Sequence, residues 1–92
     1  MPWIYAGLKN EQISAPSRIV NTDHFIDVYL DIVKIEQELY DHIVCAEMLN
    51  GQVVELYRAE SEPNNLKSNT VAKGKAKDFF LEISKLLNAE LI

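Results

Sequence analysis

The chain has 92 residues, 48% of them hydrophobic and 25% charged, which predicts one globular domain over residues 1–92 and excludes a disordered chain. Its net charge of −5 argues against general affinity for nucleic acid or an anionic membrane, because both select basic surfaces. A single cysteine excludes an intrachain disulfide, and no apolar run approaches the roughly 18 residues that span a bilayer, so we expect a soluble, cytoplasmic protein.

The N-terminal segment is short, aromatic and apolar from Trp3 to Leu8, which predicts a β-strand. Pro2 lacks a backbone donor, so we expect this strand to pair at the edge of a sheet. Residues 9–22 are polar and contain Pro16, which indicates a loop. The apolar pair within that loop suggests a second short strand around Arg18 to Val20.

Residues 22–40 predict an amphipathic helix. The preceding segment, Asn21-Thr22-Asp23, offers three N-cap residues. Apolar residues then recur at spacings of 3 and 4, and polar residues keep a helical period from Asp23 to Asp41. The segment from Ile26 to Ile32 also alternates as a strand does, but the period of the polar residues favours the helix. The apolar face of this helix comprises Phe25, Val28, Ile32, Ile35 and Leu39.

Residues 42–59 predict a β-hairpin, because Asn50-Gly51 between two apolar runs suits a two-residue type I′ turn. This loop length places Met48 opposite Val53, Ala46 opposite Glu55 and Val44 opposite Tyr57. Both faces of the hairpin are largely apolar, so helices cover both or one face meets another subunit. We assign Val54 and Leu56 to such a dimer face. In the alternative interpretation Asn50-Gly51 ends a single long helix over residues 23–49.

Residues 61–69 contain Pro63 and indicate a loop, after which Thr70 caps a helix over residues 70–89. The apolar face of this helix is Ala72, Ala76, Phe79, Phe80, Ile83, Leu86 and Leu87. The predicted fold is therefore α+β, with a small antiparallel sheet (the N-terminal strand and the hairpin) packed by two helices through Phe25, Ile32, Phe79 and Ile83. The alternative is an all-α fold.

Two groups of residues invite a chemical interpretation, and neither predicts a catalytic site, a metal or a cofactor. Asp23, Asp27 and Asp31 form an acidic stripe, but no Glu-x-x-His motif accompanies it, so we interpret the stripe as a solvated face. Cys45 could pair with His42 or His24 as a nucleophile, yet it lies in an apolar run, where cysteine behaves as a small hydrophobe.

Charge is distributed unevenly along the chain. Residues 20–62 carry ten acidic residues against Lys34 and Arg58, whereas residues 67–77 carry four lysines and no acid. The lysine segment around Gly74 lacks the spaced glycines of a phosphate-binding loop. These lysines oppose the helix dipole, which suggests either a functional or pairing role for them or a contact with the acidic segment, within the fold or across a dimer.

The leading functional hypothesis is a non-enzymatic interaction module, acting through a protein partner as an accessory, inhibitor or immunity-type protein. We also predict a homodimer. The alternative is a small-molecule-binding domain with an aromatic pocket, and the weakest hypothesis is an enzyme that uses His24 or His42 with Asp27 or Glu38. The predicted ligand or partner surface is aromatic and comprises Trp3, Tyr5, Tyr29 and Tyr57.

Overall fold

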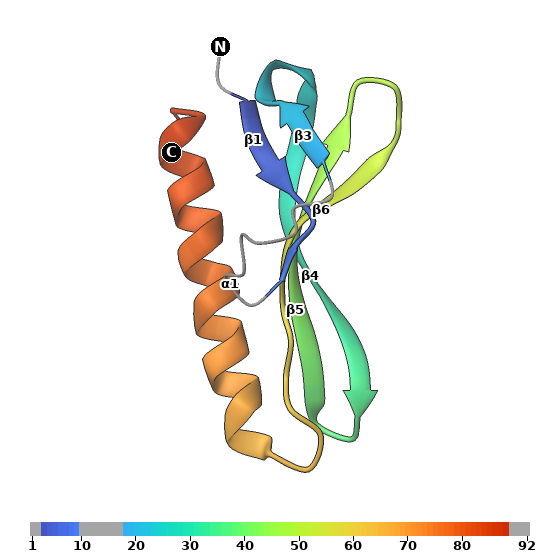
Figure 1. Ribbon diagram of the computed structural model, residues 1–92, viewed down its shortest axis with the longest axis vertical. Helices are drawn as coiled ribbons and strands as arrows, with labels where there is room; N and C mark the ends of the chain where they lie inside the picture. Colours follow the sequence, from blue (N-terminus) through green and yellow to red (C-terminus); the bar gives the residue numbers. More distant parts are fainter. Residues whose placement is uncertain (1–2, 10–17, 89–92) are drawn as a thin grey trace.

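The computed structural model describes residues 3–9 and 18–88. Within them the chain forms six strands, one 3-10 turn and one long helix (Figure 1). In chain order the elements are β1 (Trp3–Ala6), β2 (Leu8–Lys9), β3 (Arg18–Asn21), η1 (Thr22–His24), β4 (Phe25–Glu36), β5 (Leu39–Met48), β6 (Val53–Ala59) and α1 (Leu66–Leu86). The α+β class is confirmed, but the described residues form one long helix where the sequence predicted two.

Two sheets make up the β layer. The larger has the strand order β2-β6-β5-β4, and the smaller pairs β1 with β3. Because β2 runs parallel to β6, the larger sheet is mixed and not antiparallel as predicted. The helix α1 runs along one side of the larger sheet (Figure 1).

The predicted N-terminal strand is divided in two by Gly7, whose φ of 78° lies in the left-handed region that glycine tolerates. The first part, β1, pairs with β3, so the second short strand predicted around Arg18 to Val20 is present. The second part, β2, joins the larger sheet beside β6. Most of the predicted loop at residues 9–22 lies outside the described residues, as does residue 89 of the predicted C-terminal helix.

The predicted helix over residues 22–40 is wrong, because this segment forms the 12-residue strand β4. The cap is present: the Asn21 side chain accepts the Asp23 N–H at 3.0 Å, and a single 3-10 turn follows. The backbone then becomes extended at Phe25 and pairs with β5 as far as Glu36 opposite Leu39. The β-branched residues of this segment fit a pleated sheet, and pairing with β5 overrides the helical spacing.

The hairpin of β5 and β6 is confirmed, with a different turn. Gly51 N–H donates to the Met48 carbonyl at 2.9 Å, and Met48 N–H donates to the Gln52 carbonyl at 2.8 Å. These bonds enclose a three-residue loop in which Gly51, with a φ of 84°, is the residue in the left-handed region. The predicted type I′ turn, which needs two such residues, is therefore wrong.

The loop length changes the register of the hairpin near its turn. Val44 lies opposite Tyr57 as predicted. Beyond a register shift between Val44 and Cys45, Ala46 lies opposite Val54 and not opposite Glu55. Such a shift is the signature of a β-bulge, which inserts one extra residue into one strand.

The helix α1 begins at Leu66, four residues before the predicted cap Thr70, and Asn65 occupies the N-cap position. Its buried face comprises Ala72, Ala76 and Ile83. The Phe79 ring stacks on Tyr57 of β6 with ring centroids 4.9 Å apart. The hydrophobic core therefore lies between α1 and the sheet side that carries Val44, Ala46, Val54, Leu56, Tyr57 and Ala59.

The connection from β6 to α1 is held by Asp41, a buried carboxylate of β5. Asp41 accepts a hydrogen bond from the Arg58 guanidinium at 2.9 Å and another from the Ser61 N–H at 3.0 Å. The Ser61 hydroxyl donates to the Tyr40 carbonyl at 2.6 Å. Since these bonds join β5, β6 and the connection, they fix where α1 starts along the sheet.

Candidate interaction surface

The strand β4 forms one edge of the larger sheet. It pairs with β5 on one side, and no strand among the described residues pairs with its other side. Its 12 residues make it about twice as long as a typical strand. Its exposed large apolar side chains are Ile26, Leu30, Ile32, Val33 and Ile35. We call this strand with its free side the β4 edge.

Two apolar side chains of the β4 edge, Leu30 and Ile32, are exposed because of where α1 lies. Leu30 is opposite Val44 and Ile32 is opposite His42, so both project to the side of the sheet that α1 covers. At the level of Ile32 the helix contacts β5, where His42 Nε2 lies 2.9 Å from the Asn69 Oδ1. The helix covers β5 and leaves Leu30 and Ile32 47% and 54% exposed.

The backbone of the β4 edge presents hydrogen-bonding groups outward. The Ile32 N–H donates to the Asp31 side chain at 2.8 Å and therefore does not pair with β5. In an antiparallel pair, alternate residues direct both backbone groups to the same side of the strand. Between the two register shifts of β4, Val28, Leu30, Ile32 and Lys34 therefore direct their N–H and C=O groups to the free side.

The side of β4 that faces away from α1 is acidic. Asp27 lies opposite Glu47 of β5. Asp31 lies on the same face of β4, two residues beyond Tyr29, and Tyr29 itself is opposite Cys45. The pKa of Tyr29 is raised, chiefly because desolvation disfavours the charged phenolate. The nearby Cys45, Asp31 and Asp27 raise it further, because they would repel a phenolate. This side of the edge therefore disfavours further negative charge.

Cys45 is buried in the sheet, 5% exposed. The pKa of its thiol is raised, chiefly because burial disfavours the thiolate and also because Glu55 lies near. Burial and a raised pKa both leave the thiol protonated, which is the state of a structural cysteine.

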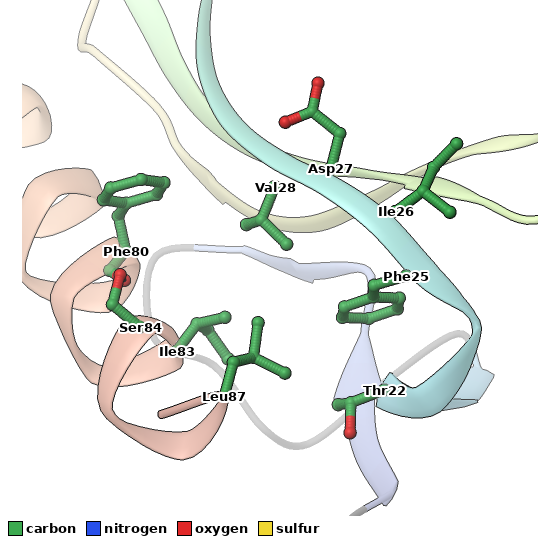
Figure 2. Close-up of a pocket in the computed structure, with 9 residues that line it drawn as sticks. All are labelled: Thr22, Phe25, Ile26, Asp27, Val28, Phe80, Ile83, Ser84 and Leu87. Carbon is green, nitrogen blue, oxygen red and sulfur yellow. The ribbon is translucent and has the colours of Figure 1, made fainter. Parts of the chain in front are cut away.

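A groove of about 450 Å³ lies between the start of β4 and the C-terminal part of α1. Figure 2 shows the side chains of Phe25, Val28, Ile83 and Leu87 pointing into it, whereas the Asp27 carboxylate points to the opposite side of the strand. The groove adjoins the β4 edge, because residues 25–28 line it. It therefore extends the apolar surface of the edge toward the helix.

The four aromatic residues predicted as a ligand or partner surface do not lie together. Trp3 and Tyr5 are exposed on β1. Tyr57 is buried beneath α1, 1% exposed, whereas Tyr29 lies on the opposite side of the sheet. Since Tyr57 and Tyr29 are on different sides, the four residues do not line one pocket.

The residues predicted as a dimer face, Val54 and Leu56, are 5% and 0% exposed. They belong to the same core cluster as Ala72 and Ala76 of α1. A second copy could reach them only if the helix moved away, so Val54 and Leu56 do not form an open face in this fold. Sequence reasoning missed this edge, although the alternation from Ile26 to Ile32 was a signal for a strand.

Of the predicted catalytic pairs, His42 and Asp27 lie on opposite sides of the sheet. His42 projects toward α1, whereas Asp27 projects to the opposite side, and His24 is exposed in η1. Glu38 lies in the turn between β4 and β5 with a φ of 63°. Among the described residues, no three His, Cys, Asp or Glu side chains gather as a metal site would require.

The lysine segment occupies the N-terminal half of α1. Lys67 and Lys75 line a shallow hollow together with Glu60 and Glu62. Part of the segment therefore lies beside acidic residues of the same chain, which is one of the two arrangements that the sequence predicted.

Comparison of the chain with protein-family models, with curated proteins and with solved structures finds no match. In the described part of the chain, no helix has both the length and the apolar character needed to cross a membrane.

Proposed function

We propose that this chain is a non-enzymatic interaction module that acts through a protein partner, as an accessory, inhibitor or immunity-type protein would. The observation that carries the proposal is the β4 edge, a long strand whose free side has no neighbour in the described residues and whose apolar side chains are exposed. An exposed edge strand can pair with a strand of another chain. Sheet proteins therefore usually protect such an edge with a short strand, a charged residue, or a helix or loop that covers it.

The mode of binding that this edge supports is strand addition. A partner strand would pair with the outward N–H and C=O groups of Val28, Leu30 and Ile32. In this mode the main chain supplies affinity, and contacts with alternate side chains supply specificity. The Asp31 carboxylate, which accepts the Ile32 N–H, must give up that bond when a strand is added. Binding therefore exchanges a local bond for a bond to the partner.

A capture experiment with two matched variants tests the proposal. Wild-type protein, Ile32→Lys and Val71→Lys are immobilised and exposed to extract of the native cell. Ile32 and Val71 are similarly exposed, at 54% and 58%, but Val71 lies on α1 away from β4. We expect a protein retained by wild type and by Val71→Lys to be lost with Ile32→Lys. Retention of the same proteins by all three would contradict binding through β4.

The groove between β4 and α1 favours a second candidate function, the binding of an apolar small molecule. Its volume of about 450 Å³ lies within the range of ligand sites. A Ser84→Trp substitution would fill the groove, whereas Thr70→Trp adds the same ring at an exposed position of the same helix. Loss of binding of an apolar fluorescent probe by Ser84→Trp alone would support this function. Equal binding by both variants would contradict it.

A further inference from the structure

We infer that the strand added to the β4 edge is β4 of a second copy, paired antiparallel about a twofold axis that passes beside Leu30. This inference rests on the proposed function, because it names the partner for the same surface.

The pairing segment is limited by the register shifts of β4. They lie between Phe25 and Asp27 and between Lys34 and Glu36, so the regular strand runs from Asp27 to Lys34. In an isologous antiparallel pair, one residue lies opposite itself and its neighbours pair symmetrically around it. Tyr29, Leu30, Asp31 and Ile32 are the residues near the middle of the regular strand that could occupy this centre.

The acidic residues exclude two of these four registers. A pair centred on Asp31 places this residue opposite the partner's Asp31, and a pair centred on Tyr29 places Asp27 opposite the partner's Asp31. Like charges directly opposite each other destabilise a sheet. A pair centred on Ile32 avoids this, but it pairs only residues 30–34 of the regular segment. The register centred on Leu30 pairs residues 27–33 and places no charged residues opposite each other.

The register centred on Leu30 gathers the exposed apolar residues on the α1 side of the sheet. Leu30 lies opposite the partner's Leu30, and Val28 lies opposite the partner's Ile32. The Ile32 N–H then donates to the backbone of the partner's Val28 and releases Asp31. Leu30 and Ile32, now about half exposed, gain apolar side-chain contacts across the pair in both copies. On the other side, Tyr29 lies opposite the partner's Asp31 and Asp27 opposite the partner's Val33.

This arrangement brings negative charges of the two copies near each other, so the dimer should depend on salt in a characteristic way. Asp31 and the partner's Asp31 lie diagonally across the pair at roughly 7–8 Å, and each copy carries a net charge of −5. Because salt screens repulsion between exposed charges over about 10 Å at 0.1 M ionic strength, the dimer should tighten as salt is raised. Asp31→Asn should tighten it at low salt by several-fold. A dimer held by ion pairs would respond in the opposite direction.

The experiment combines sedimentation equilibrium with cysteine cross-linking. Paired residues that exchange backbone bonds have Cα atoms about 5.5 Å apart, within the range of a disulfide. Leu30→Cys should therefore form a disulfide dimer with itself under mild oxidation, and a mixture of Val28→Cys with Ile32→Cys should cross-link as a heterodimer. Ile32→Cys alone and wild type, whose Cys45 is buried, are the controls that should remain uncross-linked.

A wild-type mass of one chain at every micromolar concentration, in low and high salt, would overturn the inference. Self-linking of Ile32→Cys without self-linking of Leu30→Cys would overturn the register. Both outcomes are distinct from failure of the proposed function. If Ile32→Lys still abolishes capture of a protein while wild type sediments as one chain, a different strand occupies β4.

Discussion

The two strands that flank β5 are similar in composition and opposite in environment. On one side β6 lies beneath α1, and Leu56 and Tyr57 are buried in the core. On the other side β4 also carries many large apolar residues, yet Leu30 and Ile32 are about half exposed. The difference follows from the position of one helix, which covers β5 and β6 and approaches β4 at its start, where Phe25 and Val28 pack against the core. Apolar content alone does not decide which strand becomes core and which becomes surface.

The largest effect expected from this comparison is the loss of a core side chain. Leu56→Ala removes a fully buried leucine beneath α1 and should lower the free energy of unfolding by about 2–5 kcal/mol. Chemical denaturation followed by circular dichroism measures this loss. If the free energy of unfolding fell by less than an ordinary surface substitution lowers it, α1 would not pack on β6 as described.

A smaller effect is expected where α1 is tied to the sheet. Asp41→Ala removes the acceptor for Arg58 and leaves the buried Ser61 N–H without that bond. The loss should be about 2 kcal/mol, since an unsatisfied buried donor and a broken charged bond both contribute. Asp41→Asn, which keeps an oxygen acceptor, is the control and should cost less. If both substitutions lowered the free energy of unfolding equally, the loss of the Asp41 charge would account for the whole effect.

The covering helix itself can be made more stable. Gly74 lies in the interior of α1, and a Cβ built there meets no atom within 4 Å. Gly74→Ala should therefore raise the free energy of unfolding by about 1 kcal/mol through helix propensity. Thermal denaturation provides the measurement. A decrease would indicate that the helix needs flexibility at this position.

The smallest effect on stability is expected at the β4 edge. Ile32→Lys should change the free energy of unfolding by no more than about 0.5 kcal/mol, because the side chain is exposed and packs on little. The same substitution is expected to abolish association through β4. Denaturation and sedimentation of the same sample separate the two properties. A large loss of stability in the monomer would show that Ile32 is part of the core.

The error at residues 22–40 has a physical origin in the spacing of particular residues. Asp23, Asp27 and Asp31 are four residues apart, and a spacing of four keeps residues on one face of a helix and also on one face of a strand. The apolar residues did not resolve the ambiguity, because β4 exposes apolar side chains on both of its faces. Pairing with β5 makes β4 a strand, and such pairing cannot be seen in the segment itself.

Other features could be predicted because their causes are local. Asn50 and Gly51 mark a turn in any hairpin, and the burial of Cys45 follows from its apolar run. The length of the loop could not be predicted, because a left-handed Gly51 suits two-residue and three-residue loops alike. The sequence predicts a dimer contact at Val54 and Leu56 only if two helices leave a face of the hairpin open. The single helix covers that face instead.

The short strand β2 determines how far such an assembly can grow. Gly7 N–H donates to the Glu55 carbonyl at 2.9 Å, and Leu8 and Lys9 pair with Tyr57 and Arg58. The outer side of β6 is therefore occupied along most of its length by the chain's own N-terminal segment. A sheet with two open sides could add copies without limit and form a fibre. Here the edge opposite β4 is β2, which is only two residues long and offers little backbone for pairing. If copies join through β4, the assembly would therefore stop at two copies.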